Sequence, residues 1–185
     1  LEAAAVRICR EAGARVVTNC FMCDMNLDVP PNDGRRLEVV ANNLPLWNGA
    51  QLAIDTTLVS PLRANGEAIP LSHDYDGIAL NRARRRKETT HPELLARNGR
   101  VRLVVLAIET GGRWQTENIE FIRMLAKAKV RELPIPSQAA AEKSWTRRWA
   151  NCLACAAQRA VALSLLELPA EQGHNLDGLS QTCCA

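Results

Sequence analysis

Aromatic side chains are rare in this sequence, at 4% of 185 residues. Few aromatic faces are available for stacking on bases, which argues against single-stranded nucleic acid as a ligand held mainly by stacking. The chain also lacks an apolar run near the ~18 residues that a membrane span requires, so we expect no membrane insertion. No internal repeat is found, which excludes solenoid architectures.

A dominant charge of one sign is missing too, because the formal net charge is only +3. The distribution of the basic residues is more informative than their number. One cluster lies within six residues and a second lies near the C-terminus: Arg82, Arg84, Arg85, Arg86 and Lys87, then Arg147 and Arg148. A solvated helix face explains such clusters, and so does a surface that contacts the phosphates of DNA.

Seven cysteines and no signal-like start, since the chain opens on Leu1-Glu2, predict an intracellular, reducing compartment with free thiols. The first residue is Leu rather than Met, so we interpret the chain as a piece of a longer product. Two Cys-x-x-Cys pairs, at Cys20/Cys23 and Cys152/Cys155, formally allow a four-thiolate zinc site. The second pair lies inside a predicted helix and neither has a glycine-rich turn, so buried thiols are the favoured interpretation.

The hydrophobic pattern predicts an α/β domain with a small mixed central sheet flanked by helices and a long C-terminal helix. Expected strands are 15–19, 37–41, 51–60 and 101–108. Expected helices are 1–13, 77–97 with a break at Pro92, 116–130 and 137–168. We predict an α/β domain over residues 1–132, a helical appendage over 133–169 and a disordered tail over 170–185. The continuous apolar run at 101–108 is typical of a strand in the middle of a mixed sheet.

Two carboxylates stand where the strand pattern calls for apolar residues: Glu38 in the first β-rich run and Asp55 in the second. A buried acid costs free energy unless it is paired or binds a metal. On adjacent strands the two could converge on one divalent cation, with Lys87 on the following helix beside them. Carboxylates, a cation and an ammonium group are the parts that phosphodiester hydrolysis needs. The alternative is a solvent-facing Glu38 and a hydrogen-bonded Asp55 at a strand end.

Several segments resemble the C-terminal part of non-LTR retroelement reverse-transcriptase polyproteins. The matching pieces cover about residues 10 to 169: Arg35–Val40, Gln51–Pro61, Ala83–Lys87, His91–Leu94, Ile108–Trp114, Trp149, Ala156–Ala160 and Leu165–Pro169. The resemblance implies a restriction-like endonuclease of the PD-(D/E)xK type that nicks DNA with Mg²⁺ or Mn²⁺. It also implies an upstream reverse transcriptase, contact with DNA or element RNA, and a nuclear location.

The motif of that family maps onto this chain unevenly. Its basic–Pro–Asp element falls on Arg36-Leu37-Glu38, where the proline is lost and the aspartate is a glutamate. Its second acid falls on Asp55, its helix lysine on Lys87, and an aromatic position one turn later on His91. The resemblance gives Glu109 a structural or metal-supporting role.

The altered first element leaves two other hypotheses open. One is a catalytically inactive remnant that still binds nucleic acid through Arg82, Arg84, Arg85, Arg86, Arg147 and Arg148. The other is a protein-interaction module that binds a partner through Trp145 and Trp149 on the long helix.

Overall fold

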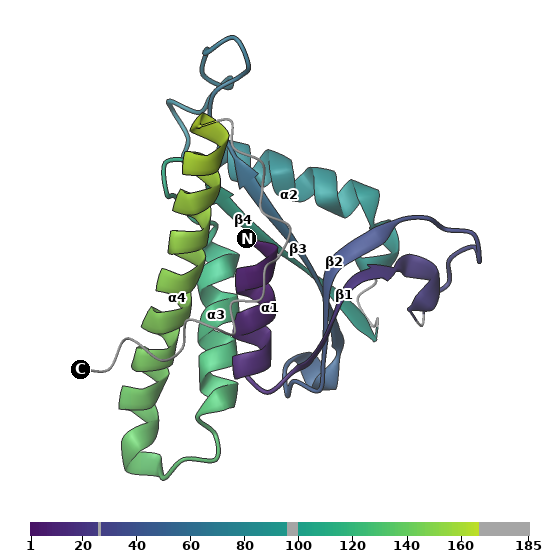
Figure 1. Cartoon of the computed structure of the whole chain (residues 1–185), viewed down its shortest axis with the longest axis vertical. Helices are drawn as coiled ribbons and strands as arrows, with labels where there is room; N and C mark the ends of the chain where they lie inside the picture. Colours follow the sequence, from purple (N-terminus) through teal and green to yellow (C-terminus); the bar gives the residue numbers. More distant parts are fainter. Residues whose placement is uncertain (26, 96–99, 167–185) are drawn as a thin grey trace.

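The computed structural model describes residues 1–25, 27–95 and 100–166 (Figure 1). These residues form four α-helices and four strands, with three short 3₁₀ helices between them. In order they are α1 (Glu2–Glu11), β1 (Arg15–Phe21), η1 (Met22–Asp24), β2 (Arg36–Asn42), η2 (Trp47–Gly49), β3 (Gln51–Val59), α2 (Ile78–Thr90), η3 (Pro92–Leu95), β4 (Val101–Glu109), α3 (Thr116–Lys129) and α4 (Ile135–Leu165).

The four strands form one mixed sheet in the order β1-β2-β3-β4. The first three are antiparallel neighbours, whereas β3 and β4 are parallel over nine aligned residues. Parallel neighbours need a crossover connection, and α2 supplies it. The chain reverses between β2 and β3 through Asn43, Trp47 and Asn48, each with a positive φ.

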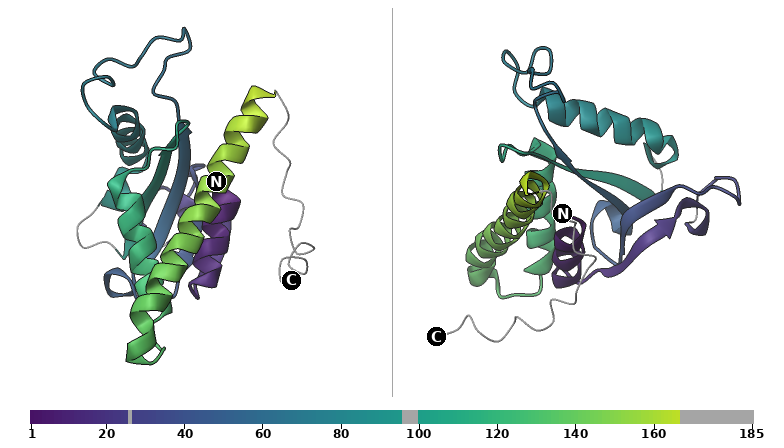
Figure 2. Two further views of the ribbon diagram at one scale, coloured as in Figure 1. Left: turned by 90° about the vertical axis from the view of Figure 1, so that its left-hand side faces the viewer. Right: turned by 45° about the horizontal axis from the view of Figure 1, so that its top comes forward.

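Helices cover both faces of the sheet (Figure 2). On one face α1, α3 and α4 enclose the larger core, which includes Ile8, Ile54, Ile122 and Trp149. On the other face α2 crosses β3 and β4, and a smaller core of Met22, Leu37, Val40, Ala53 and Leu94 continues below it. Alternate residues of β3 therefore serve different cores, because successive strand side chains point to opposite faces.

The predicted sheet is confirmed in its strands but not in the placement of the last one. The runs at 37–41 and 51–60 form β2 and β3, and α2 ends before Pro92 as predicted; residues 96–97 of that predicted helix lie outside the described part. The prediction that 101–108 occupies the middle of the sheet is wrong, because β4 is an edge strand. Its continuous apolar pattern reflects helices over both faces, and coverage of faces does not require a neighbour on each edge.

The long helix α4 is part of the main core rather than separate from it. Trp149, Leu153 and Ala157 are almost fully buried against α1 and α3. The Trp149 indole Nε1 donates to the Glu11 carboxylate at 2.8 Å. The interaction-module hypothesis requires an exposed Trp149, but this side chain is buried. Trp145 is half-buried beside it, with 5.2 Å between the ring centroids.

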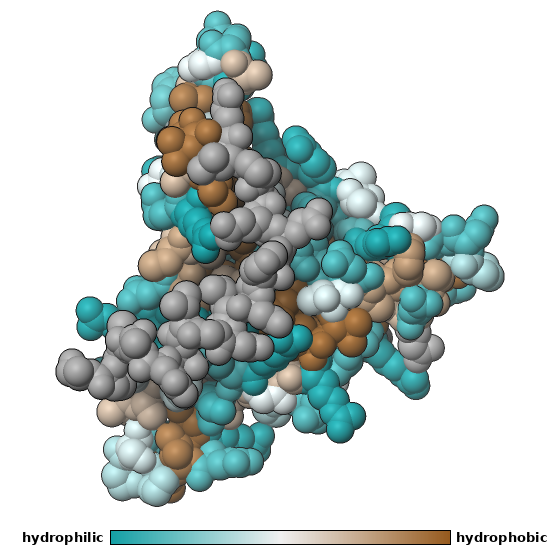
Figure 3. All heavy atoms as spheres, viewed as in Figure 1, coloured by the Kyte–Doolittle hydropathy of each residue, from teal (hydrophilic) through white to brown (hydrophobic). Residues whose placement is uncertain are grey.

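The surface seen in Figure 3 is mainly hydrophilic, with apolar patches toward both ends of α4. Exposed aliphatic side chains occur at those ends, including Ile135 and Leu165. Within the described residues, no helix combines the length and the apolar character needed to cross a membrane. The predicted tail at 170–185 lies outside the described residues.

Candidate functional site

The Asp55 side chain points from β3 toward α2, on the face of the sheet that α2 covers. Asp55 shares its face of β3 with Ala53 in the smaller core, because the two are two positions apart. Lys87 and His91 are four positions apart and therefore project from the same side at the end of α2. Both point toward Asp55, so the crossover helix that makes β3 and β4 parallel also delivers the predicted lysine.

The Lys87 ammonium donates to the Asp55 carboxylate, with 2.7 Å between Nζ and Oδ1. Asp55 has only 5% of its side chain exposed, against 28% for Lys87. Burial raises the pKa of Asp55, and the hydrogen bond from Lys87 opposes that rise. The nearby Glu38 carboxylate acts in the same direction as burial on this pKa. A cation therefore stabilises the ionised form of this carboxylate by more than it would at the protein surface.

Glu38 lies beside Asp55 on the neighbouring strand. The β2–β3 register ends at the pair of Val39 with Ile54, so Glu38 and Asp55 are the next residues beyond that pair. The Glu38 Oε2 atom accepts hydrogen bonds from the Thr56 main-chain N–H at 2.8 Å and from the Thr56 hydroxyl at 2.7 Å. This side chain thus replaces a ladder hydrogen bond where β2 diverges from β3, and it is held in a fixed orientation.

His91 completes the group from the C-terminal end of α2. Its Nε2 atom lies 3.8 Å from Asp55 Oδ2, and its side chain is 4% exposed. Burial lowers the pKa of His91, while the charge of Asp55 opposes this. The Nδ1 atom is buried without a hydrogen-bond partner among the described residues. A neutral imidazole packed against the carboxylate fits these surroundings.

Arg35 ties the start of β2 to the end of α2. Its guanidinium donates to both Asp33 oxygens, to both Glu93 oxygens and to the Thr90 carbonyl, with the shortest contacts at 2.6 Å. The hydrogen bond from Arg35 lowers the pKa of Glu93. Because Glu93 is 58 residues from Arg35 in sequence, this clamp holds the strand of Glu38 against the helix of Lys87 and His91.

Together these side chains surround a hollow of about 300 Å³, hereafter the polar pocket. Its lining has four basic side chains, two carboxylates, a threonine and a histidine: Arg35, Arg36, Arg86, Lys87, Glu38, Asp55, Thr90 and His91. The three predicted catalytic residues Glu38, Asp55 and Lys87 are therefore brought together from β2, β3 and α2. Sequence reasoning missed Arg35 and Thr56, since ordinary residue types with distant partners leave no local signal.

Glu109 is not brought to the polar pocket. In the β3–β4 register Asp55 aligns with Val105, whereas Glu109 aligns with Val59 at the other end of β4. Four residues along a strand separate the two positions by about 13 Å. The Glu109 carboxylate lies 3.8 Å from Arg113 instead, and its main-chain N–H donates to the Arg113 carbonyl. Its geometry fits a structural role at the strand end and not metal support at Asp55.

The predicted DNA-contacting arginines divide into three groups. Arg82, Arg85 and Arg86 are exposed on α2, and Arg86 reaches the polar pocket. Arg84 turns the other way and pairs with Glu88 and Glu117. Arg147 is exposed on α4, and Arg148 pairs with Glu11 at 3.1 Å. Because α2 and α4 cover opposite faces of the sheet, the two clusters do not form one surface (Figure 2).

The cysteine pairs do not assemble a metal site in the part of the chain that the structure describes. Cys20 and Cys23 lie at the end of β1 and in η1, whereas Cys152 and Cys155 lie on α4. Within residues 1–25, 27–95 and 100–166, no three His, Cys, Asp or Glu side chains form a group able to hold a metal. Burial raises the pKa of the Cys9 thiol to about 12, as expected for a packed, unreactive cysteine.

The polar pocket nevertheless suits a hard cation that is bound partly by the protein. Mg²⁺ is commonly held by one or two carboxylates, with waters and substrate phosphates as its other ligands. Asp55 and the second oxygen of Glu38 fit that donor set, and burial of the Asp55 carboxylate favours a positive charge beside it. Comparisons with protein-family models and with curated proteins found no match.

Proposed function

We propose that this chain is a restriction-like endonuclease domain of a retroelement-derived protein, which hydrolyses DNA phosphodiester bonds with Mg²⁺ or Mn²⁺. The observation that carries the proposal is the convergence of Glu38, Asp55 and Lys87 on one pocket. These residues come from three elements, and the resemblance singles out all three. The small mixed sheet with helices on both faces is compatible with the fold that the resemblance implies.

Each residue has a distinct part in this proposal. Asp55 and Glu38 would hold the cation, which when bound supplies positive charge for the developing phosphorane and acidifies a water. Thr56 keeps Glu38 oriented through two hydrogen bonds, so the carboxylate needs little reorganisation when substrate arrives. Lys87 donates to the Asp55 carboxylate, and in this proposal its ammonium group would contact a phosphate oxygen or an attacking water.

DNA would approach across the exposed side of α2. Arg82, Arg85 and Arg86 point into solvent there, and Arg86 also lines the polar pocket. Side chains of this kind contact phosphates, which sets affinity and its salt dependence without reading sequence. Attachment to an upstream reverse transcriptase, contact with element RNA and nuclear location belong to the same proposal.

A nicking assay tests the chemistry. Purified protein is incubated with supercoiled plasmid and Mg²⁺, and relaxation is compared between wild type, Asp55→Asn and the control Glu132→Gln, an exposed residue after α3. We expect Asp55→Asn to lower the rate by at least about 100-fold, because it removes a charge that faces the metal and the reacting phosphate. Glu132→Gln leaves the rate unchanged. Equal rates for wild type and Asp55→Asn would exclude this site as the catalytic one.

A second candidate is a non-catalytic DNA-binding domain, which one observation favours. Lys87 already occupies one Asp55 oxygen, and Thr56 already occupies one Glu38 oxygen. A pocket satisfied in this way is stable without a metal. This candidate predicts salt-dependent binding to duplex DNA that the double variant Arg85→Gln/Arg86→Gln weakens, together with no nicking at any Mg²⁺ or Mn²⁺ concentration.

A further inference from the structure

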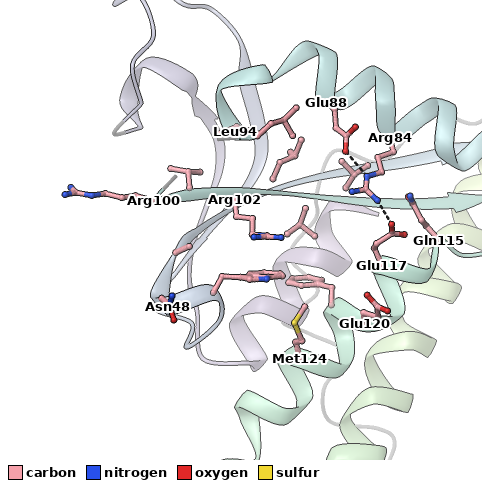
Figure 4. A pocket seen from close by; sticks show the side chains of 18 of the residues that line it. Asn48, Arg84, Glu88, Leu94, Arg100, Arg102, Gln115, Glu117, Glu120 and Met124 are labelled. Carbon is pink, nitrogen blue, oxygen red and sulfur yellow. Dashed lines mark hydrogen bonds and ion pairs between the residues drawn. The ribbon is translucent and has the colours of Figure 1, made fainter. Parts of the chain in front are cut away.

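A second and larger hollow lies on the other side of α2, along the free edge of β4 (Figure 4). It measures about 1050 Å³, and we call it the β4 trench. Its floor is the first half of β4, from Arg100 to Val105. One wall comes from α2 and η3, including Arg84 and Leu94. The other comes from η2 and α3, including Trp47 and Phe121, whose rings stack with 6.2 Å between centroids.

The main chain of β4 presents unused hydrogen-bonding groups to the trench. At one end Gln51 N donates to Arg100 O, and at the other Thr110 N donates to Val59 O, both at 2.8 Å. With an unbroken parallel register between them, the even-numbered residues of β4 bond to β3. The odd-numbered residues face outward. The N–H and C=O groups of Val101, Leu103 and Val105 therefore point away from β3, where the described residues supply no further strand.

The chain itself begins a fifth strand on this edge and then leaves it. Trp114 forms an antiparallel bridge with Ile108, and Glu109 N donates to Arg113 O. The segment continues only to Gln115, because α3 begins at Thr116. Asn118 reaches back from α3 to bond the Ala107 carbonyl at 2.6 Å. Pairing along the edge is therefore closed from Ala107 onward and open before it.

Two side chains at this junction have unused acceptors. Gln115 is 6% exposed and lines the trench, and its Oε1 atom is buried with no hydrogen-bond partner among the described residues. Asn118 Oδ1 is in the same state. A buried acceptor left unpaired costs free energy, so an N–H donor arriving from the trench would remove that cost.

We infer that the β4 trench binds an extended segment of another polypeptide, which adds to the sheet antiparallel to β4 where the Arg113–Gln115 segment leaves off. Antiparallel is the direction that the chain's own bridge already takes. Alternate side chains of the segment would meet the Trp47–Phe121 wall and the Leu94 wall. The inference is independent of the nuclease proposal.

Charges at the two ends of the trench specify the occupant further. Arg100 lies at the end where β4 begins, and Glu120 lies toward the end where the trench closes (Figure 4). The Arg100 guanidinium and the Glu120 carboxylate have no ion-pair partner in the described part of the chain. The fitting segment has a basic residue N-terminal to an alternating apolar run and an acidic residue after it.

A second copy of this chain is a poorer occupant. Paired strands lie about 4.8 Å apart, so both edges must be accessible to each other. Here α2 and α3 contribute walls on both sides of the β4 edge (Figure 4). A copy whose β4 has the same walls would bring helix against helix before the strands could pair. A single extended segment has no such walls.

The test uses a synthetic peptide, acetyl-Lys-Val-Thr-Val-Thr-Val-Glu-amide, titrated into isotopically labelled full chain. We expect NMR shifts in the amides of Val101, Leu103 and Val105, and slower hydrogen exchange there. The same peptide N-methylated at the amides that face β4 should not bind. Glu120→Arg should weaken binding about fivefold, the upper range for an exposed ion pair. The matched control Glu132→Arg should leave the affinity for the peptide unchanged.

Three results would overturn the inference. One is the absence of shifts at these amides at millimolar peptide. Another is equal binding of the N-methylated peptide. The third is protection of the same amides before any peptide is added. If that protection grows with protein concentration, a second copy occupies the trench; if it does not, the chain's own residues do.

Discussion

The polar pocket and the β4 trench lie on either side of α2, and they treat their polar groups in opposite ways. In the polar pocket Asp55, Glu38 and Arg35 are held by several short hydrogen bonds from different elements. In the trench Gln115 Oε1 has no hydrogen-bond partner within the described residues, and the outward main-chain groups of Val101, Leu103 and Val105 face no further strand there. The side chains of the polar pocket are thus fixed by hydrogen bonds within the protein, whereas polar groups of the trench are left open to a partner.

The difference follows from where each hollow lies in the sheet. The polar pocket lies over β2 and β3, which both have a strand on each side, and the Thr56 main-chain N–H beside it bonds to the Glu38 side chain. The trench lies at an edge, where main-chain groups remain free. Natural edges are often protected by charges, and Arg100 and Arg102 are such residues here. Arg102 extends over the Trp47 ring at 4.8 Å.

The largest effect expected is on β4, whose first half forms the floor of the trench. Val104→Pro removes an N–H that bonds to β3 and should cost about 3 kcal/mol or more of unfolding free energy. Leu103→Pro removes an N–H that faces the trench and should cost clearly less, although it also removes a half-buried side chain. Denaturant titrations measure the unfolding free energy of both variants. Equal losses would contradict the assigned alternation along β4.

The next effect concerns the charge balance of the polar pocket. Lys87→Met leaves Asp55 buried without its cation, and we expect a loss of about 2 kcal/mol, below that of a fully buried pair because Lys87 is partly exposed. Arg85→Met on the same helix is exposed and should change stability by less than about 0.5 kcal/mol. If the two variants lose the same stability, the Asp55–Lys87 pair is no more important than a surface charge.

In the trench the corresponding change has the opposite sign. Gln115→Met removes the unpaired Oε1 atom and retains the volume, so we expect a gain of about 1 kcal/mol in the free protein. Chemical denaturation measures the gain. Asn118→Leu serves as the contrast, because it also deletes the bond to the Ala107 carbonyl and should destabilise. A loss of stability in Gln115→Met would mean that this amide is satisfied in solution.

The smallest effect is a dependence on pH. Burial lowers the pKa of His91 in the folded state, so the unfolded chain binds the proton more readily. Stability from this residue is complete above its unfolded pKa of about 6.5 and declines as pH falls below that value. Asp55 changes stability with pH in the opposite sense, because burial raises its pKa. The other charged groups that act on the His91 imidazole are Arg35, Lys87 and Glu93.

His91→Gln should therefore flatten the pH dependence of unfolding between about pH 6.5 and 5, with a difference below about 1 kcal/mol across that interval. Thermal unfolding at a series of pH values gives both slopes, so the comparison survives any general loss of stability in the variant. Identical slopes would show that folding does not shift the pKa of His91.

The sequence predicted the elements and part of the polar pocket for identifiable reasons. Asp55 and Glu38 stand out because acids interrupt apolar strand patterns, and Lys87 stands out through the resemblance. The clamp of Arg35 with Glu93 could not be predicted, since its partners lie 58 residues apart and are common surface residues. The role given to Glu109 ignored its distance along β4 from the residue aligned with Asp55. The two arginine clusters looked alike in sequence, yet they lie on opposite faces.

By itself, the sequence determined local periodicity: which residues form strands, where Pro92 ends α2, and which residues of each element are apolar. The tertiary structure alone decided that β4 is an edge strand, that Lys87 and His91 meet Asp55, and that Gln115 Oε1 is buried with no partner in the described part of the chain. The physical reason is that periodicity records whether a face is covered, whereas strand order and the partners of polar groups depend on how elements far apart in the chain come together.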